Sequence, residues 1–319
     1  MTNNYIYQVA GFRFSVQVPA GLDIQTLLPS FRAFRCEEEG GDLLFSLEAH
    51  HASLPEDASA VLWEESANDM GFSRLLRTAD GYRVMLRYTE QGATHVVRTD
   101  RRFTEAQAAI DWSDPFAGQV LVSMLRMVYS QAVVYHRAIS IHASVVQLGA
   151  RGYLFMGKSG TGKSTHSALW MQAFEGCELL TDDNPTLRLM EDEVWVYGTP
   201  WSGKTPCYKN KRYPLAAMVR LRQAKTNRFV EQTDVAAFIT VLPGCSVVRK
   251  DAEQYDALCA TLVEMTGMVK VGTLDCLPDR EAAFLCWGEV KGERLRVCIL
   301  SSRAKRRISE VISKEKRKH

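Results

Sequence analysis

The stretch Gly157-Lys-Ser-Gly-Thr-Gly-Lys-Ser164 matches the phosphate-binding loop pattern G-x-x-x-x-G-K-[ST] at every fixed position. Residues 152–156 before it form a short apolar run that predicts a strand. Residues 164–174 after it carry helix formers and an apolar stripe, which predict a helix. Strand, glycine loop and helix is the context that the motif requires, so the stretch predicts an α/β fold.

The loop predicts a nest for phosphate groups. Its glycines allow backbone conformations that a Cβ would forbid, so that successive N–H groups can point inward at phosphate oxygens. The start of the following helix adds its positive dipole end. We expect Lys163 to reach the β- and γ-phosphates and Ser164 to hold Mg²⁺. The residues expected to bind the nucleotide are Gly157, Lys158, Ser159, Gly160, Thr161, Gly162, Lys163, Ser164 and Thr165.

The composition is that of an ordinary globular protein. The chain has 319 residues, of which 46% are hydrophobic and 24% charged, a length that suggests about two domains. The net charge of +2 gives no reason to expect a nucleic-acid partner. No apolar run is long enough for a bilayer and the N-terminus lacks a secretion pattern, so we expect a cytoplasmic protein without a membrane partner. The eight cysteines form no C-x-x-C pair, which favours reduced core residues over a zinc or redox site.

Residues 1–112 predict a small antiparallel β-rich domain. The clearest signal is residues 72–99, where period-two alternation flanks Asp80-Gly81, a favoured hairpin turn. This part carries no catalytic pattern. His50, His51 and His95 have no carboxylate or cysteine partner at ligand spacing, so we interpret them as surface or packing residues.

The rest of the chain changes character after a linking helix over residues 113–137, which Asp114-Pro115 would start. Residues 138–319 read as a nucleotide-binding domain with a helical C-terminal part. Residues 139–148 predict one strand that carries His142 and turns into the loop strand. Helices are expected over 234–242 and 252–266. A basic amphipathic helix, interpreted as a solvated tail rather than a partner-binding patch, is expected over 303–319.

Asp182 and Asp183 end the next short strand, about twenty residues beyond Lys163. Phosphoryl transfer needs a carboxylate for the metal and a group that orients the acceptor. We expect Asp183 to join Ser164 at Mg²⁺ and Asp182 to be the base, although the two roles can be exchanged. An alternative is that one of the pair only starts the turn into Asn184-Pro185.

The ordered segments Ile141-His-Ala-Ser-Val-Val146, Gly157–Ser164 and Leu180-Thr-Asp-Asp183 resemble the phosphoenolpyruvate carboxykinase and HPr kinase/phosphorylase superfamily. The chain looks most like the C-terminal kinase domain of HPr kinase, over residues 138 to about 220. The resemblance implies a P-loop kinase core of mixed sheets with flanking helices. It also implies metal binding and base catalysis by the Asp pair, and a place for His142 in the active site.

The sequence departs from that family after the Asp pair. The Arg-Gly segment of HPr kinases is absent, and a Trp201-Ser-Gly-Lys204 loop stands in the comparable region, which does not favour HPr as the acceptor. Lys204 is a candidate for holding the acceptor or the transferred phosphate, with an exposed loop lysine as the equal alternative. Carboxykinase arginine motifs are not visible, so keto-acid chemistry ranks last.

These patterns together predict an ATP- and Mg²⁺-dependent kinase that acts on a hydroxyl of an unidentified protein, peptide or small molecule. The catalytic candidates are Asp182, His142 and Lys204, and the metal candidates are Ser164 and Asp183. One alternative is a nucleotide-binding regulatory or accessory module without catalysis, and a less favoured one is a carboxykinase-like enzyme. An oligomer is possible.

Overall fold

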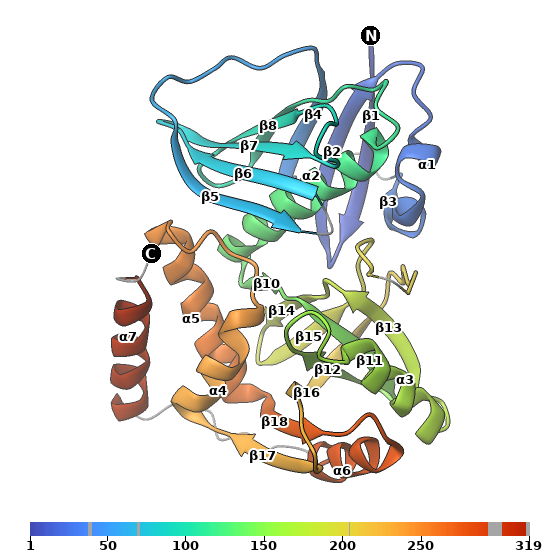
Figure 1. The fold of residues 1–319 in the computed structure, drawn as a ribbon, viewed down its shortest axis with the longest axis vertical. Helices are drawn as coiled ribbons and strands as arrows, with labels where there is room; N and C mark the ends of the chain where they lie inside the picture. Colours follow the sequence, from blue (N-terminus) through green and yellow to red (C-terminus); the bar gives the residue numbers. More distant parts are fainter. Residues whose placement is uncertain (38–39, 69–70, 204, 293–301, 317–319) are drawn as a thin grey trace. The chain divides into compact units, whose positions relative to one another are not determined.

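The computed structural model describes residues 1–37, 40–68, 71–203, 205–292 and 302–316. The chain forms two compact units, Met1–Val133 and Val134–His319. Each unit contains one large mixed β-sheet with helices packed on it, so the structure is mixed α/β (Figure 1). The helix predicted over 113–137 is shorter, α2 (Ala117–Ala132), and it falls within the first unit.

The first unit is built on a nine-stranded sheet of order β3-β1-β2-β4-β9-β8-β7-β6-β5. Its second half is the expected meander, and the turn at Asp80-Gly81 joins β6 to β7. The prediction of a purely antiparallel sheet is wrong, because the central strand β4 is parallel to both β2 and β9. The strands are β1 (Thr2–Val9), β2 (Phe12–Pro19), β3 (Arg35–Cys36), β4 (Phe45–His51), β5 (Val61–Asn68), β6 (Gly71–Arg77), β7 (Gly81–Arg87), β8 (His95–Asp100) and β9 (Glu105–Ala109).

The parallel pairing follows from the connection between β2 and β4. That connection passes through the short helices α1 (Ile24–Leu27) and η1 (Pro29–Phe34) and returns the chain to the end from which β2 started. Aromatic residues of β2, β4 and α2 fill the core of this unit. The rings of Phe14 and Phe45 stack with centroids 4.7 Å apart, and Tyr129 of α2 packs on Phe14 at 6.1 Å.

The second unit contains a nine-stranded mixed sheet whose main path is β10-β14-β15-β16-β12-β11-β13. The long strand β16 is antiparallel to β15 at its start and then parallel to β12 and β18. The strands are β10 (Ala138–Ser140), β11 (Ala143–Leu148), β12 (Arg151–Met156), β13 (Glu178–Asp183), β14 (Thr186–Met190), β15 (Glu193–Tyr197), β16 (Arg212–Gln223), β17 (Arg228–Gln232) and β18 (Lys270–Cys276).

The single strand predicted over 139–148 is wrong, because the chain changes partners in its middle. β10 pairs with β14, whereas β11 pairs with β12 and β13. Ile141 and His142 lie between the two strands, and their backbone N–H groups donate to the carbonyls of Pro185 and Gly244. His142 is therefore not inside a regular strand.

Five α-helices of the described part accompany this sheet: α3 (Lys163–Ala173), α4 (Asp234–Val241), α5 (Ala252–Met268), α6 (Arg280–Val290) and α7 (Ser302–Lys316). The predicted α4 and α5 are confirmed, whereas α6 was not foreseen. In α7, Ile308 is buried, and Val311 and Ile312 pack against the same core as α4 and α5. The apolar face of the C-terminal helix thus belongs to the core, which the solvated-tail interpretation missed. No helix within the described ranges is both long and apolar enough to cross a bilayer.

Candidate functional site

The loop after β12 has the backbone that its glycines allow. Gly160 and Gly162 have φ values of 79° and 96°, in the region that side chains disfavour. Gly162 immediately precedes Lys163, the first residue of α3. A Cβ at Gly157 would lie 2.4 Å from Oγ1 of Thr161, whose hydroxyl donates to the Lys158 carbonyl at 2.6 Å. The loop is therefore a tight turn that larger residues would distort.

The start of α3 presents free donors at this loop. Within the described part of the chain, no side chain caps the helix, and the first-turn N–H groups of an α-helix have no partner inside it. Lys158, Ser159 and Gly160 are exposed, and so are Ser164 and Thr165 of the first turn. Exposed loop residues and uncapped amides at a helix N-terminus form a surface that suits an anion.

Strand register brings three more residues to the same edge of the sheet. Ala143 of β11 pairs with Met156 at the end of β12 and with Asp183 at the end of β13. His142 precedes Ala143, so it lies beside both the loop and the Asp pair. The prediction that these segments come together is borne out in position, although His142 lies at a break between strands.

A chain of contacts links Lys163 to Asp183 through His142. Nζ of Lys163 lies 2.9 Å from Nε2 of His142, and Nδ1 of His142 lies 2.7 Å from Oδ1 of Asp183. An ammonium group can only donate, so Nε2 is the acceptor in this contact and Nδ1 carries the proton that Asp183 accepts. Lys163 also donates to the Gly157 carbonyl at 3.1 Å. The lysine is thus held over the loop by groups that a phosphate can replace.

The environment of Lys163 disfavours its charge. Partial burial lowers the pKa of the Lys163 ammonium, while the nearby carboxylates of Asp183 and Asp182 oppose this effect. An anion at the loop would act in the same direction as the two carboxylates and stabilise the charged form.

Ser164 contacts the other acid of the pair. Its Oγ donates to Asp182, at 3.1 Å from Oδ1 and 3.0 Å from Oδ2. Asp182 is only 4% exposed, whereas Ser164 faces solvent at the first turn of α3. A hydroxyl and a carboxylate facing each other next to the glycine loop are ligands of the kind that Mg²⁺ takes.

Asp183 is held in an uncommon conformation. Its φ is 141°, in the region normally left to glycine. Three neighbours hold it there. Its Oδ1 lies against His142, its Oδ2 accepts from Nδ2 of Asn184 at 2.5 Å, and its backbone forms a β-bridge with Ser202. Ser202 and Gly203 therefore lie against the Asp pair, since the Gly203 N–H also donates to the Asp182 carbonyl.

The structure thus brings together most of the predicted site residues: the loop, Lys163, Ser164, Asp182, Asp183 and His142. Lys204 lies outside the described residues. Two polar residues at the site were not predicted. Asn184 orients Asp183, and Gln223 at the end of β16 donates from Nε2 to the Gly160 carbonyl at 3.1 Å. The Asn-Pro pair after the two acids was a visible signal for Asn184. Gln223 reaches the loop only because β16 pairs in parallel with β12, which the sequence does not show.

The first unit contains histidine contacts that the sequence interpretation missed. Nε2 of His95, which is fully buried, lies 3.1 Å from Oδ2 of Asp114. Nε2 of His51 lies 3.2 Å from Oε2 of Glu48, with His50 stacked beside it at 4.6 Å between ring centroids. The statement that these histidines lack carboxylate partners is therefore wrong. Glu48 is only two residues from His50, a spacing that places both on one side of a strand.

Comparison with known proteins shows a partial likeness to solved structures. No protein-family model and no curated protein matches the sequence. Among solved structures, the chain is similar to the HPr(Ser) kinase/phosphatase from Coxiella burnetii. The identity is 12%, the TM-score is 0.28, and the match covers 48% of this chain and 93% of that one.

Proposed function

We propose that the second unit is an ATP- and Mg²⁺-dependent phosphotransferase that acts on a hydroxyl group of a protein, peptide or small molecule. The observation that carries the proposal is the convergence of Lys163 and Ser164 with Asp182 and Asp183 from β13. His142 links Lys163 to Asp183 by contacts of 2.9 and 2.7 Å, and Ser164 contacts Asp182 directly at 3.1 Å. Phosphoryl transfer needs a cradle, a metal ligand pair and a proton acceptor, and these side chains supply all three.

The residues fit a bound nucleotide and metal. Gly157 lets the loop turn tightly, because a Cβ there would clash with Thr161, and the uncapped start of α3 directs N–H groups at the loop. Lys163 would exchange its contacts with His142 and the Gly157 carbonyl for phosphate oxygens. When bound, Mg²⁺ supplies neutralisation of the charge that develops on the transferred phosphoryl group.

The contacts favour an assignment of the Asp pair opposite to the one expected from sequence. Asp182 would hold Mg²⁺ with Ser164, because its two oxygens already face the Ser164 hydroxyl. Asp183 would work with His142 on the acceptor side. Since Nδ1–H of His142 is donated to Asp183, Nε2 is the atom that would take the proton of the acceptor hydroxyl once Lys163 has moved to phosphate.

The test compares Lys163→Ala, Asp182→Asn and Asp183→Asn in the purified full-length chain. The readouts are binding of a fluorescent ATP analogue at several Mg²⁺ concentrations and release of γ-phosphate from ATP to water. Lys163→Ala and Asp182→Asn should weaken nucleotide binding, the second mainly by raising the Mg²⁺ requirement. Asp183→Asn should bind normally but lose about 10²–10⁴-fold in turnover, because His142 would lose the carboxylate that orients it as the base.

Lys291→Ala and Asp192→Asn are matched controls, since both residues are exposed and lie outside the site. ATP binding without γ-phosphate release above the Lys163→Ala background, with water or with added serine peptides, would contradict the proposal and favour a nucleotide-binding regulatory module. An increased Mg²⁺ requirement in Asp183→Asn instead of Asp182→Asn would restore the assignment expected from sequence.

A further inference from the structure

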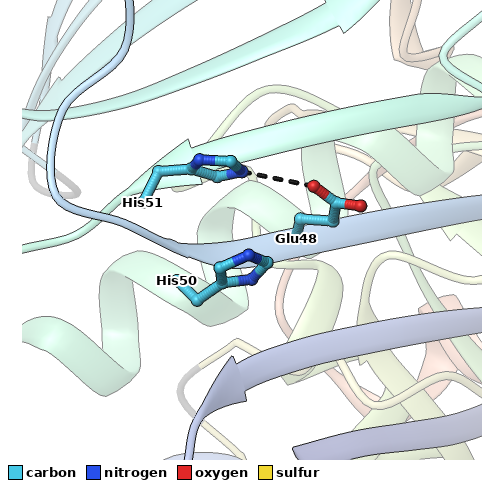
Figure 2. Close-up of side chains that lie close together, drawn as sticks. All are labelled: Glu48, His50 and His51. Carbon is cyan, nitrogen blue, oxygen red and sulfur yellow. Dashed lines mark hydrogen bonds and ion pairs between the residues drawn. The ribbon is translucent and has the colours of Figure 1, made fainter. Parts of the chain in front are cut away.

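A group of potential metal ligands lies on β4 of the first unit, away from the loop and its acids in sequence. Glu48, His50 and His51 each offer one ligand atom, and these atoms lie within 4.8 Å of one another. Figure 2 shows the His51 ring and the Glu48 carboxylate pointing toward each other, with the His50 ring next to them. We call these three residues the β4 cluster.

A β-bulge creates the cluster. Glu48 pairs with Gln107 of β9, and His51 pairs with Ala109, so three steps along β4 match two steps along β9. Residues in paired positions point to the same side of a sheet, and Gln107 and Ala109 share a side because they are two apart. The extra residue in β4 therefore turns His51 to the side of Glu48, where a regular strand would point it away.

The cluster lies on the side of β4 opposite to the core. Phe45, Leu47 and Ala49 are almost fully buried and alternate with the half-buried Glu48 and His50. The cluster is thus accessible without opening the core. On both neighbouring strands the residue paired with Glu48 is a neutral amide, Gln17 on β2 and Gln107 on β9. No cation stands at those two positions to neutralise the Glu48 carboxylate.

His50 adds a second observation. Its Nδ1 is buried and has no hydrogen-bond partner in the described part of the chain. A ring nitrogen withdrawn from water without a partner destabilises the folded chain. An unpartnered ring nitrogen on a residue of a three-ligand cluster favours a bound cation over packing alone.

We propose that the β4 cluster binds a divalent transition-metal ion of the Zn²⁺ type. Two imidazoles and one carboxylate are a ligand set that Zn²⁺ takes, and three protein ligands leave a coordination position for water or another donor. Hard cations such as Mg²⁺ prefer oxygen ligands, so the cluster would select a different metal from the Ser164–Asp182 pair. The inference concerns the first unit and stands independently of the proposed phosphotransferase.

The test titrates chelator-treated, full-length protein with ZnCl₂ by calorimetry. Because His142, Asp182 and Asp183 could also bind Zn²⁺, the titrations are made in a His142→Gln/Asp183→Asn background. That background should bind a single Zn²⁺ per chain. Adding His51→Ala or His50→Ala should weaken binding at least about 100-fold, beyond the effect usual for loss of an outer-shell partner. Glu64→Gln, at an exposed acid on the edge strand β5 of the same sheet, is the control and should leave the affinity unchanged.

Glu48→Gln, which keeps the size of the side chain, replaces the histidine variants should these fail to fold, and it should also weaken binding. Co²⁺ provides a second readout, because its visible absorption is stronger in a four-coordinate site than in a six-coordinate one. No Zn²⁺ binding in the background, or equal affinity after His51→Ala and Glu48→Gln, would overturn the proposal and leave the cluster as a hydrogen-bonded pair with a stacked ring.

Discussion

The two units bring histidines and carboxylates together in different ways. In the second unit, His142, Lys163 and Asp183 come from separate elements, and strand register aligns the ends of β11, β12 and β13 at one edge. In the first unit, Glu48, His50 and His51 lie within four residues of a single strand, and one extra residue turns His51 to its partner. A sheet edge assembles groups distant in sequence, whereas a bulge can only rearrange neighbours. Aligned strand ends can therefore combine side chains of different chemical types from distant segments, whereas a bulge can combine only the side chains already present in one strand.

The largest effect on turnover should come from His142→Gln, which tests whether His142 accepts the proton of the acceptor hydroxyl. Glutamine is polar but offers no basic nitrogen, so turnover should fall about 10²–10⁴-fold while ATP affinity changes little. Steady-state γ-phosphate release and fluorescent ATP binding measure the two quantities. His136→Gln, at a partly exposed histidine outside both clusters, is the control. Unchanged turnover in His142→Gln would remove this histidine from the proposed mechanism.

A smaller effect should come from Gly157→Ala, which perturbs the loop and leaves the Asp pair intact. The added Cβ would meet Oγ1 of Thr161 at 2.4 Å, so the loop would have to rearrange. Displacing preorganised donors typically costs about 10²-fold, and we expect a loss of that size in affinity for Mg²⁺-ATP.

Gly267→Ala is the matched control for that substitution. Gly267 lies in α5, and its added Cβ would meet nothing within 4 Å. It should raise the free energy of unfolding by about 0.5–1 kcal/mol and leave ATP affinity unchanged. Equal ATP affinity in Gly157→Ala and Gly267→Ala would argue against a phosphate cradle at this loop.

The smallest expected effect is a change in the free energy of unfolding with pH, and it comes from a difference in how each unit buries a histidine. His95 of the first unit contacts Asp114, whereas His166 of the second accepts from Nε1 of Trp170 at 3.0 Å, and burial lowers the pKa of His166 to about 4. As the pH falls, His166 of the unfolded chain is protonated near its ordinary pKa of 6.5, whereas His166 of the folded protein stays neutral until the pH approaches 4. Stability from the neutral His166 is therefore complete above about pH 6.5 and is lost as the pH falls toward 4.

Between pH 7 and pH 5 this loss should be about 2 kcal/mol. Urea unfolding followed by tryptophan fluorescence at both pH values measures it. His166→Gln cannot titrate, so its free energy of unfolding should fall by about 2 kcal/mol less over the same interval. A variant that loses as much stability as the original protein would show that His166 does not carry this pH dependence.

The sequence predicted the candidate site of the second unit better than the β4 cluster of the first unit, because local motifs encode the former. The glycine loop, the two acids at a strand end and the order of the segments were all visible in the chain. Two features were not visible. The change of strand partners at Ile141 and His142 depends on β14, forty-odd residues away, and the contact of Gln223 with Gly160 depends on the parallel pairing of β16.

In the first unit, the strand pairing and the bulge that form the β4 cluster depend on residues distant in sequence. Alternation identifies strands but not their neighbours, so the parallel pairing of β4 on both sides could not be predicted from residues 1–112. The bulge that turns His51 toward Glu48 depends on the register with β9, more than fifty residues later. Histidines without a motif were for this reason interpreted as isolated.

The backbone of Asp183 places conformational strain at a residue of the candidate site. A non-glycine residue at a φ of 141° costs on the order of 1–3 kcal/mol, which a glycine at this position would largely avoid. A search for thermostable variants should therefore find position 183 among the easiest gains, and such a gain would eliminate the carboxylate beside His142. Engineers who select only for melting temperature would discard a carboxylate that the proposed phosphotransfer requires.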